Sequence, residues 1–146
     1  MTSGRPPPVF GLWHVALNVR ALAPMERFYV DIMGFAVEWR PDPENVYLST
    51  GRDNLALHVA PGLPPPGHIG VLDHIGFFVP SFEAVDAWMA YLEASGVVMD
   101  TRPRTHRDGA RSFYLRDPER NRIQILCHPP ILKALGLDSA GDGEVS

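Results

Sequence analysis

Two histidines and one glutamine are the residues of this chain whose types and spacing could hold a metal ion. His14 lies in a β-type apolar run, and His74 lies at the matching place of a similar run in the second half of the chain. Gln124 lies in a further β-type run near the end. Two imidazoles and one oxygen donor, with coordination positions left open, form a facial ligand set for Fe, Mn, Co, Ni or Zn. An open position lets a substrate oxygen bind the metal.

Strand geometry determines whether these three side chains can meet. Successive side chains of a strand point to opposite faces, so His14 shares a face with Ala16, and Gln124 lies on the face opposite Ile125. If two such sheets pair, their concave sides form a cup that collects His14, His74 and Gln124. The alternative is that each histidine is an ordinary hydrogen-bonded core residue. The matching place of the two histidines favours shared metal ligation.

The elements that must position these residues form two similar halves. The proline-rich segment 60–67 continues neither a helix nor a central strand. Each half reads β-α-β-β-β, which predicts an α+β fold of two βαβββ modules joined in a cup-shaped mixed sheet. The alternative is two unrelated α+β halves. The strands are expected at residues 12–19, 36–40, 45–50 and 54–60, and at residues 73–79, 97–101, 110–116 and 122–128. The predicted domains are a first module at 10–60, a linker at 61–71, a second module at 72–130 and a flexible tail at 138–146.

The helix in each half has recognisable end signals. Pro24 suits the first turn of the first helix. Ser81 is expected to cap the second helix, with Glu83 in its first turn. Each helix is expected to end at a glycine, Gly34 and Gly96, because glycine tolerates a left-handed C-terminal cap.

Composition excludes several classes of protein. The 146 residues are 45% hydrophobic and 21% charged, with a net charge of −4 and no basic block. We therefore expect no nucleic-acid partner, because phosphate binding needs clustered cations. No apolar run approaches the roughly 18 residues that cross a membrane. The single cysteine, Cys127, excludes a disulfide framework and is interpreted as a buried small apolar residue. With no signal peptide at the start, a cytoplasmic location is expected.

Four stretches of sequence resemble the vicinal oxygen chelate superfamily, the glyoxalase/bleomycin resistance protein/extradiol dioxygenase group. They are LWHVALNV at 12–19, MERFYVDIMGF at 25–35, LDHIGFFV at 72–79 and SFYLRDPERNRIQI at 112–125. The resemblance covers roughly residues 10 to 130. It implies paired βαβββ modules, a divalent metal in the cup and a homodimer. Members of the group include lyases, isomerases, thiol transferases, ring-opening dioxygenases and drug-binding proteins without metal.

The resemblance assigns the metal ligands residue by residue. The first-strand histidines of the family fall on His14 and His74, and its final-strand carboxylate falls on Gln124. A neutral amide can ligate through its oxygen but brings no negative charge, so metal affinity should be lower. The first-half carboxylate of glyoxalase types falls on Ala56. His58, two residues later on the same face, is either a substitute ligand or base, or a strand-end residue satisfied by solvent or backbone.

The second half resembles the extradiol dioxygenase signature more closely. His106 and Tyr114 fall where those enzymes keep a histidine and a tyrosine that handle protons and the bound catecholate. Against this, Arg120 stands where glycine is usual, and the acid is replaced by Gln124. Alternatively, Tyr114 is an interior tyrosine and His106 belongs to an exposed loop at 101–109. Glu38 either lines the cup or lies at a solvated edge.

Two functions follow from these expectations. The first is a metal-dependent enzyme, a dioxygenase or lyase above all, with isomerase and thiol-transferase chemistry also open. It would bind a small molecule through vicinal oxygens, with His14, His74 and Gln124 as metal ligands and Tyr114 and His106 as catalytic residues. The second is a metal-free protein of the same fold that binds a drug-like or aromatic molecule. Substrate, metal identity and the pairing of the modules, within one chain or across a dimer, stay open.

Overall fold

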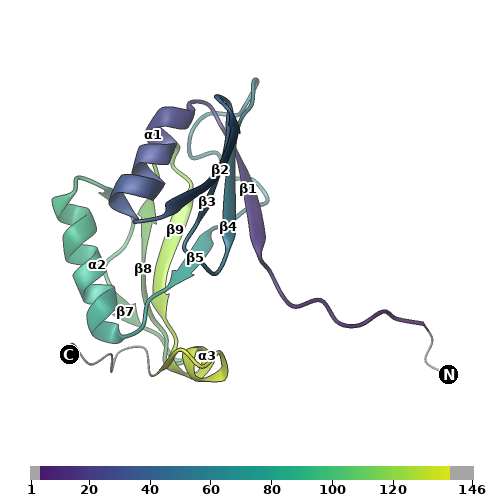
Figure 1. Ribbon diagram of the computed structural model, residues 1–146. Helices are drawn as coiled ribbons and strands as arrows, with labels where there is room; N and C mark the ends of the chain where they lie inside the picture. Colours follow the sequence, from purple (N-terminus) through teal and green to yellow (C-terminus); the bar gives the residue numbers. More distant parts are fainter. Residues whose placement is uncertain (1–3, 139–146) are drawn as a thin grey trace, which may run out of the picture. The chain divides into compact units, whose positions relative to one another are not determined.

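A computed structural model describes residues 4–138 of the chain (Figure 1). The predicted tail lies outside these residues from residue 139 onward. The chain forms two compact units, Met1–Pro61 and Gly62–Ser146, here called unit 1 and unit 2. Among the described residues, no helix has the length and apolar character needed to cross a bilayer.

Unit 1 is a four-stranded mixed sheet with one helical segment. Strand β1 lies beside β4 in parallel, and β4, β3 and β2 follow as antiparallel neighbours. The helix lies against one face of this sheet, as Figure 1 shows within the unit. The core between them includes the buried side chains of Leu17, Leu57, Met25 and Tyr29. The elements are β1 (His14–Val19), α1 (Leu22–Arg27), the π-helical turn η1 (Phe28–Ile32), β2 (Ala36–Asp42), β3 (Asn45–Ser49) and β4 (Asn54–Val59).

Unit 2 repeats this topology with small additions. Its strand order is β5-β9-β8-β6, with β5 and β9 parallel, and the short β7 pairs with β8. Helix α2 packs on β8 and β9, where Phe113, Ile123 and Ile125 are buried. The elements are β5 (Ile75–Phe78), α2 (Phe82–Ala94), β6 (Val98–Met99), β7 (Arg104–Thr105), β8 (Arg111–Arg116), β9 (Arg122–Cys127) and α3 (Pro129–Ala134).

The predicted α+β class with two mixed sheets is confirmed, and the helix ends agree with the sequence signals. The Ser81 hydroxyl accepts the backbone N–H of Ala84 at 3.0 Å. Gly34 and Gly96 take φ values of 84° and 78°, a left-handed conformation that glycine adopts without strain. The predicted faces of the first and last strands also agree, because Leu17 is buried while His14 and Ala16 are exposed, and Ile123 and Ile125 are buried.

Four details differ from the sequence prediction. The first helix ends in a wider π turn, in which the N–H of Met33 bonds the carbonyl of Phe28 at 2.9 Å. The strand predicted at 97–101 is reduced to Val98–Met99. The predicted loop at 101–109 contains β7, which is too short to show an alternating pattern. Helix α3 was not predicted; its two prolines suit a helix start, and Leu132 anchors it in the core.

Candidate functional site

Tyr114 lies at the centre of the predicted site residues in unit 2. It is directly opposite Gln124 in the β8–β9 register, and Gln124 is opposite Gly76 of β5. The Gln124 Nε2 donates a hydrogen bond to the Tyr114 hydroxyl oxygen at 3.1 Å. His74, one residue before β5, places its ring edge-on to Tyr114 with centroids 5.2 Å apart. Three of the predicted residues are therefore neighbours.

Gly76 makes room for the oxygen of the Gln124 amide. A Cβ at this position would lie 3.3 Å from Gln124 Oε1 and 3.2 Å from the Leu126 side chain. The Gln124 carbonyl oxygen therefore lies over the strand that follows His74, while its nitrogen is engaged by Tyr114. The oxygen is the atom with which an amide binds a metal.

Asp73 fixes the protonation pattern of the His74 ring. The His74 Nδ1 lies 2.6 Å from Asp73 Oδ1. This hydrogen bond is the main reason that the pKa of Asp73 is below its usual value, so the carboxylate stays charged. A charged carboxylate accepts the Nδ1–H and leaves the lone pair of Nε2 free, which is the arrangement typical of metal-ligating histidines. The His74 side chain is 32% exposed.

A positive charge covers the ring of Tyr114. The Arg122 guanidinium carbon lies 3.8 Å from the ring centroid. Arg116 and Arg122 each bind Asp100 at 2.9 Å. Burial acts to raise the pKa of Asp100, but the hydrogen bonds from the two arginines outweigh it and leave the pKa below its usual value. The sequence analysis missed Arg122, although its position two residues before Gln124 puts it on the same strand face.

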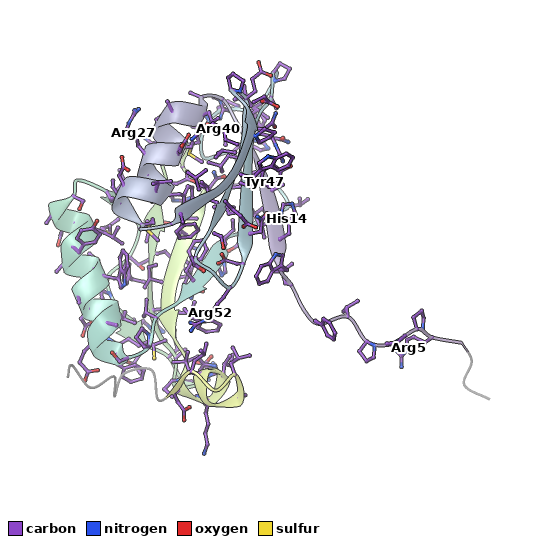
Figure 2. The ribbon with its side chains drawn as sticks, in the orientation of Figure 1. Arg5, His14, Arg27, Arg40, Tyr47 and Arg52 are labelled. Carbon is purple, nitrogen blue, oxygen red and sulfur yellow. The ribbon has the colours of Figure 1, made fainter. Side chains whose placement is uncertain are left out.

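In unit 1, His14 is held by an amide rather than a carboxylate. Its Nδ1 lies 2.5 Å from Asn54 Oδ1, and Asn54 Nδ2 donates to Glu38 at 3.0 Å. Its ring also stacks on Tyr47, with centroids 6.3 Å apart (Figure 2). Glu38, which the sequence placed either in a cup or at a solvated edge, acts here as the partner of Asn54.

His58 has a side-chain partner of its own. Its Nδ1 lies 2.5 Å from Asn45 Oδ1, so this ring nitrogen has a side-chain partner rather than a backbone one. Ala56 is fully buried and stands opposite Tyr47, as Gln124 stands opposite Tyr114. The register therefore supports the sequence alignment that puts Ala56 at the ligand position of the first half.

His106 lies at the end of the Tyr114 strand rather than beside the tyrosine hydroxyl. It is half-buried, in the turn after β7, and its Nε2 lies 3.0 Å from the Ser112 hydroxyl. Ser112 is on the same strand face as Tyr114, two residues earlier. The structure thus brings His106 to the strand face of Tyr114 through its contact with Ser112. His106 is half-buried, whereas the alternative prediction placed it in an exposed loop.

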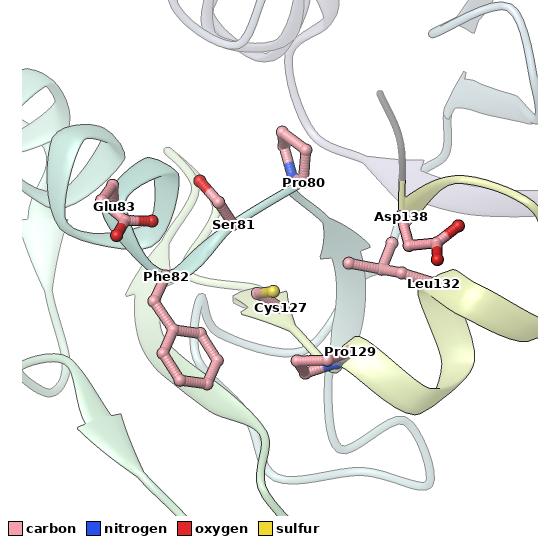
Figure 3. Close-up of a pocket in the computed structure, with 8 residues that line it drawn as sticks. All are labelled: Pro80, Ser81, Phe82, Glu83, Cys127, Pro129, Leu132 and Asp138. Atoms are coloured by element: carbon pink, nitrogen blue, oxygen red, sulfur yellow. The ribbon is translucent and has the colours of Figure 1, made fainter. Parts of the chain in front are cut away.

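A cavity of about 220 Å³ lies elsewhere in unit 2 (Figure 3). The Cys127 sulfur points into it, and burial, with a contribution from Glu83, raises the pKa of this thiol. Cys127 is 2% exposed, which confirms the interpretation as a buried small residue. None of the predicted site residues lines this cavity. Its lining residues are Pro80, Ser81, Phe82, Glu83, Cys127, Pro129, Leu132 and Asp138.

The donor set predicted from the sequence fits a divalent metal in its chemistry. Within residues 4–138, no group of three His, Cys, Asp or Glu side chains could hold a metal ion. The predicted set differs from such a group because its third member is an amide. His14 and His74 each engage Nδ1 with an oxygen acceptor, which leaves Nε2 as the donor, and Gln124 keeps its oxygen free of Tyr114.

Comparison with known proteins agrees with this topology. A profile of the Glyoxalase/Bleomycin resistance protein/Dioxygenase superfamily matches residues 11–125. The chain belongs to this superfamily. Among solved structures, a lactoylglutathione lyase from Agrobacterium tumefaciens is 25% identical, with a TM-score of 0.67 over 82% of this chain and 95% of that one.

Two other solved members show the same fold. A family enzyme from Burkholderia phytofirmans PsJN is 23% identical, with a TM-score of 0.68 over 79% of this chain and 96% of that one. A glyoxalase-related enzyme from Fulvimarina pelagi is 21% identical, with a TM-score of 0.65 over 83% of this chain and 90% of that one. These comparisons show the superfamily and the fold. The reaction must be inferred from the chemistry of the site.

Proposed function

We propose that this protein is a metal-dependent enzyme that acts on a small molecule chelated through two adjacent oxygens. His74 and Gln124 of unit 2, with His14 as the third ligand predicted by the sequence repeat, would hold Fe, Mn, Ni, Co or Zn. A divalent ion bound there would act as a Lewis acid toward the substrate oxygens. The prediction leaves open whether His14 comes from the same chain or from a second copy.

The observation that carries this proposal is the hydrogen bond from Gln124 to Tyr114. Because the hydroxyl oxygen accepts the amide N–H, its own O–H is left to donate elsewhere. A carboxylate at position 124 would instead take that proton. Tyr114 is therefore suited to donate to a substrate oxygen that becomes negative in the transition state, and such donors contribute strongly to catalysis.

Arg122 and His106 complete the proposed machinery. The guanidinium above the Tyr114 ring is attracted by the negative face of the ring and places a positive charge beside the phenol. His106, bound to Ser112, is proposed as a second residue that handles protons. Oxyanion stabilisation is shared by dioxygenase, lyase, isomerase and thiol-transferase reactions, of which the second-half signature resembles that of the extradiol dioxygenases. A homodimer and a cytoplasmic location stay predictions from the sequence.

Metal analysis tests the proposal directly. Purified protein, incubated anaerobically with Fe²⁺, Mn²⁺, Ni²⁺ and Zn²⁺ in turn, should retain close to one ion per predicted site. His74→Ala should abolish retention, whereas His68→Ala, an exposed linker histidine, should not. Failure of every ion to bind would contradict the enzyme and favour a metal-free protein that binds an aromatic molecule. Loading with Fe²⁺ and a catechol before admitting oxygen then tests ring opening by the yellow product.

A further inference from the structure

Two hydrogen-bond chains of the same kind end on the two strand histidines of unit 1. In the first, the Asn54 amide nitrogen donates to Glu38 at 3.0 Å and its oxygen lies 2.5 Å from His14 Nδ1. In the second, the Asn45 amide nitrogen donates to both Asp42 oxygens, at 2.8 and 3.0 Å, and its oxygen lies 2.5 Å from Nδ1 of His58. Each chain runs from a carboxylate through an asparagine to an imidazole.

The direction of each chain fixes which nitrogen of the ring is free. Since the carboxylate accepts from the amide NH₂, the amide oxygen faces the imidazole and can only accept. The ring must therefore donate from Nδ1, and the lone pair of the neutral ring lies on Nε2. Hydrogen bonds from Asn45 and from the Glu44 N–H lower the pKa of Asp42, which keeps the second chain charged at its far end.

A carboxylate that is linked to an imidazole by hydrogen bonds favours proton transfer to the ring as well as metal binding. A carboxylate that orients a histidine also stabilises the imidazolium that forms when the ring takes up a proton. The titratable groups against His58 are Asp42, through Asn45, and Tyr47, whose ring lies edge-on with centroids 5.7 Å apart. Asn18 is the β1 residue opposite His58 and carries no charge.

His58 lies on the same face of the unit 1 sheet as the predicted ligand His14. In the parallel β1–β4 register His14 is opposite Asn54, and His58 lies four positions further along β4. The Tyr47 ring is a neighbour of both imidazoles, stacked with His14 and edge-on to His58. On β4 this face carries Asn54, the fully buried Ala56 and His58, so His58 is its titratable side chain.

We infer that His58 is the proton acceptor for a substrate bound at this face, and that Asn45 and Asp42 are its positioning residues. The inference rests on the proposed function. A substrate O–H or C–H bond next to a chelating oxygen breaks, its electron pair stays on the substrate, and the proton goes to His58 Nε2. The substrate class is thus a small molecule with an acidic hydrogen beside its vicinal oxygens, such as a catechol or an α-hydroxycarbonyl compound.

The first test needs neither metal nor substrate. Nitrogen-15 NMR of the histidine rings in metal-free protein should show His58 and His14 as the Nδ1–H tautomer at neutral pH. Asn45→Ala should release only His58 into a mixture of tautomers, and the matched variant Asn54→Ala should release only His14. A neutral His58 that carries its proton on Nε2 would overturn the inference, whatever the outcome of metal analysis.

The second test follows the proton itself. 4-Nitrocatechol changes colour when it loses protons, and Zn²⁺ is a metal without redox chemistry of its own. On Zn²⁺-loaded protein, His58→Gln should shift ionisation of the bound probe upward by about one pH unit, a tenfold loss of the ionised form at fixed pH. Asp42→Asn, at an exposed residue, should shift it in the same direction by less. His68→Gln should leave it unchanged.

The outcomes separate the two proposals. No binding of Zn²⁺ or probe by the unaltered protein contradicts the proposed function. Binding with the same ionisation in His58→Gln and Asp42→Asn as in the unaltered protein contradicts the role of His58 alone.

Discussion

The two units place a tyrosine at the same register position and surround it differently. Tyr114 of unit 2 is opposite Gln124 and accepts its amide hydrogen bond. Tyr47 of unit 1 is opposite Ala56, a side chain with no hydrogen-bonding group, and its ring is a neighbour of both His14 and His58. The residue opposite the tyrosine therefore decides whether the tyrosine hydroxyl has a side-chain hydrogen-bond partner on the next strand.

The units also differ in how each predicted ligand histidine is supported. Asp73 contacts His74 directly, whereas Glu38 reaches His14 only through Asn54. Both arrangements engage Nδ1 of the ring and leave Nε2 as the nitrogen that could bind a metal, although the supporting residues differ. The following changes test this comparison.

Removal of the two tyrosine hydroxyls should have the largest and most unequal effects. Tyr114→Phe should lower kcat by about 10²-fold, because it removes a donor to the developing oxyanion. Tyr47→Phe keeps the ring stack and should lower kcat by less than about tenfold. Steady-state kinetics on the first substrate turned over measures both. Equal losses would show that the Gln124 hydrogen bond does not distinguish the tyrosines.

Restoring a carboxylate at the third ligand position should have the next largest effect. Gln124→Glu adds a negative charge and should tighten Zn²⁺ binding by roughly tenfold or more, since ligand charge raises affinity for divalent cations. Gln124→Ala should weaken it. Competition with a coloured chelator gives both affinities. If Gln124→Glu leaves the affinity unchanged, Gln124 is not a ligand.

Exchanging glycine for alanine at Gly76, and alanine for glycine at its unit 1 counterpart Ala16, should change the free energy of unfolding by unequal amounts. Gly76→Ala places a Cβ 3.2 Å from Leu126 and 3.3 Å from Gln124, and should lower the free energy of unfolding by about 1–3 kcal/mol. Ala16→Gly adds only backbone freedom and should cost about 0.5–1 kcal/mol. Urea denaturation measures both. A Gly76→Ala protein as stable as the original would show that the Leu126 and Gln124 side chains yield to the added Cβ, contrary to this prediction.

The helix caps offer a smaller contrast. Ser81 caps α2 with its side chain, whereas Ala21 precedes α1 without a capping side chain. Ser81→Ala should cost about 1 kcal/mol of unfolding free energy. Ala21→Ser should give a gain no larger than that loss. Thermal denaturation of the two variants checks the pair, and a Ser81→Ala protein of unaltered stability would contradict the cap.

Acid should weaken the ion-pair network of unit 2 by the smallest amount. The pKa of Asp100 is below its ordinary value of 3.8 in the folded protein. A lowered carboxyl pKa contributes stability above the unfolded value, and this contribution is lost as the pH falls through the folded value. Asp100→Asn should therefore reduce stability at neutral pH, and this reduction should disappear as the pH falls through the folded pKa of Asp100. Denaturation measured from pH 7 downward should show a shallower acid slope, and an unaltered slope would exclude Asp100 as its source.

Some features of the site were predictable because they depend on local spacing. The matching runs around His14 and His74 fix the first strand of each unit, and alternation fixes the face of Gln124. The tyrosine pair was visible too, since YLSTGRDNL at 47–55 and YLRDPERNR at 114–122 align with the tyrosines in register. The contact of His106 with Ser112 was not, because a turn of unknown path joins them.

The residues that support His58 escaped the sequence analysis, which named His58 itself as a ligand, a base or a strand-end residue. Asp42, Asn45 and His58 lie on three strands, and Asn45 meets His58 only because β3 and β4 pair in one register. Arg122 was missed for a related reason, since its stacking on Tyr114 depends on the β8–β9 ladder. Neither set carries a spacing that marks it along the chain.

The sequence by itself determined the repeated unit, the superfamily and the strand face of each candidate residue, because periodicity and turn chemistry are local properties of a chain. Tertiary structure alone decided the partner of each polar side chain: Gln124 for Tyr114, Asn45 for His58 and Asp73 rather than backbone for His74. A hydrogen bond depends on tenths of an ångström and on direction, and those are fixed only when distant strands have paired.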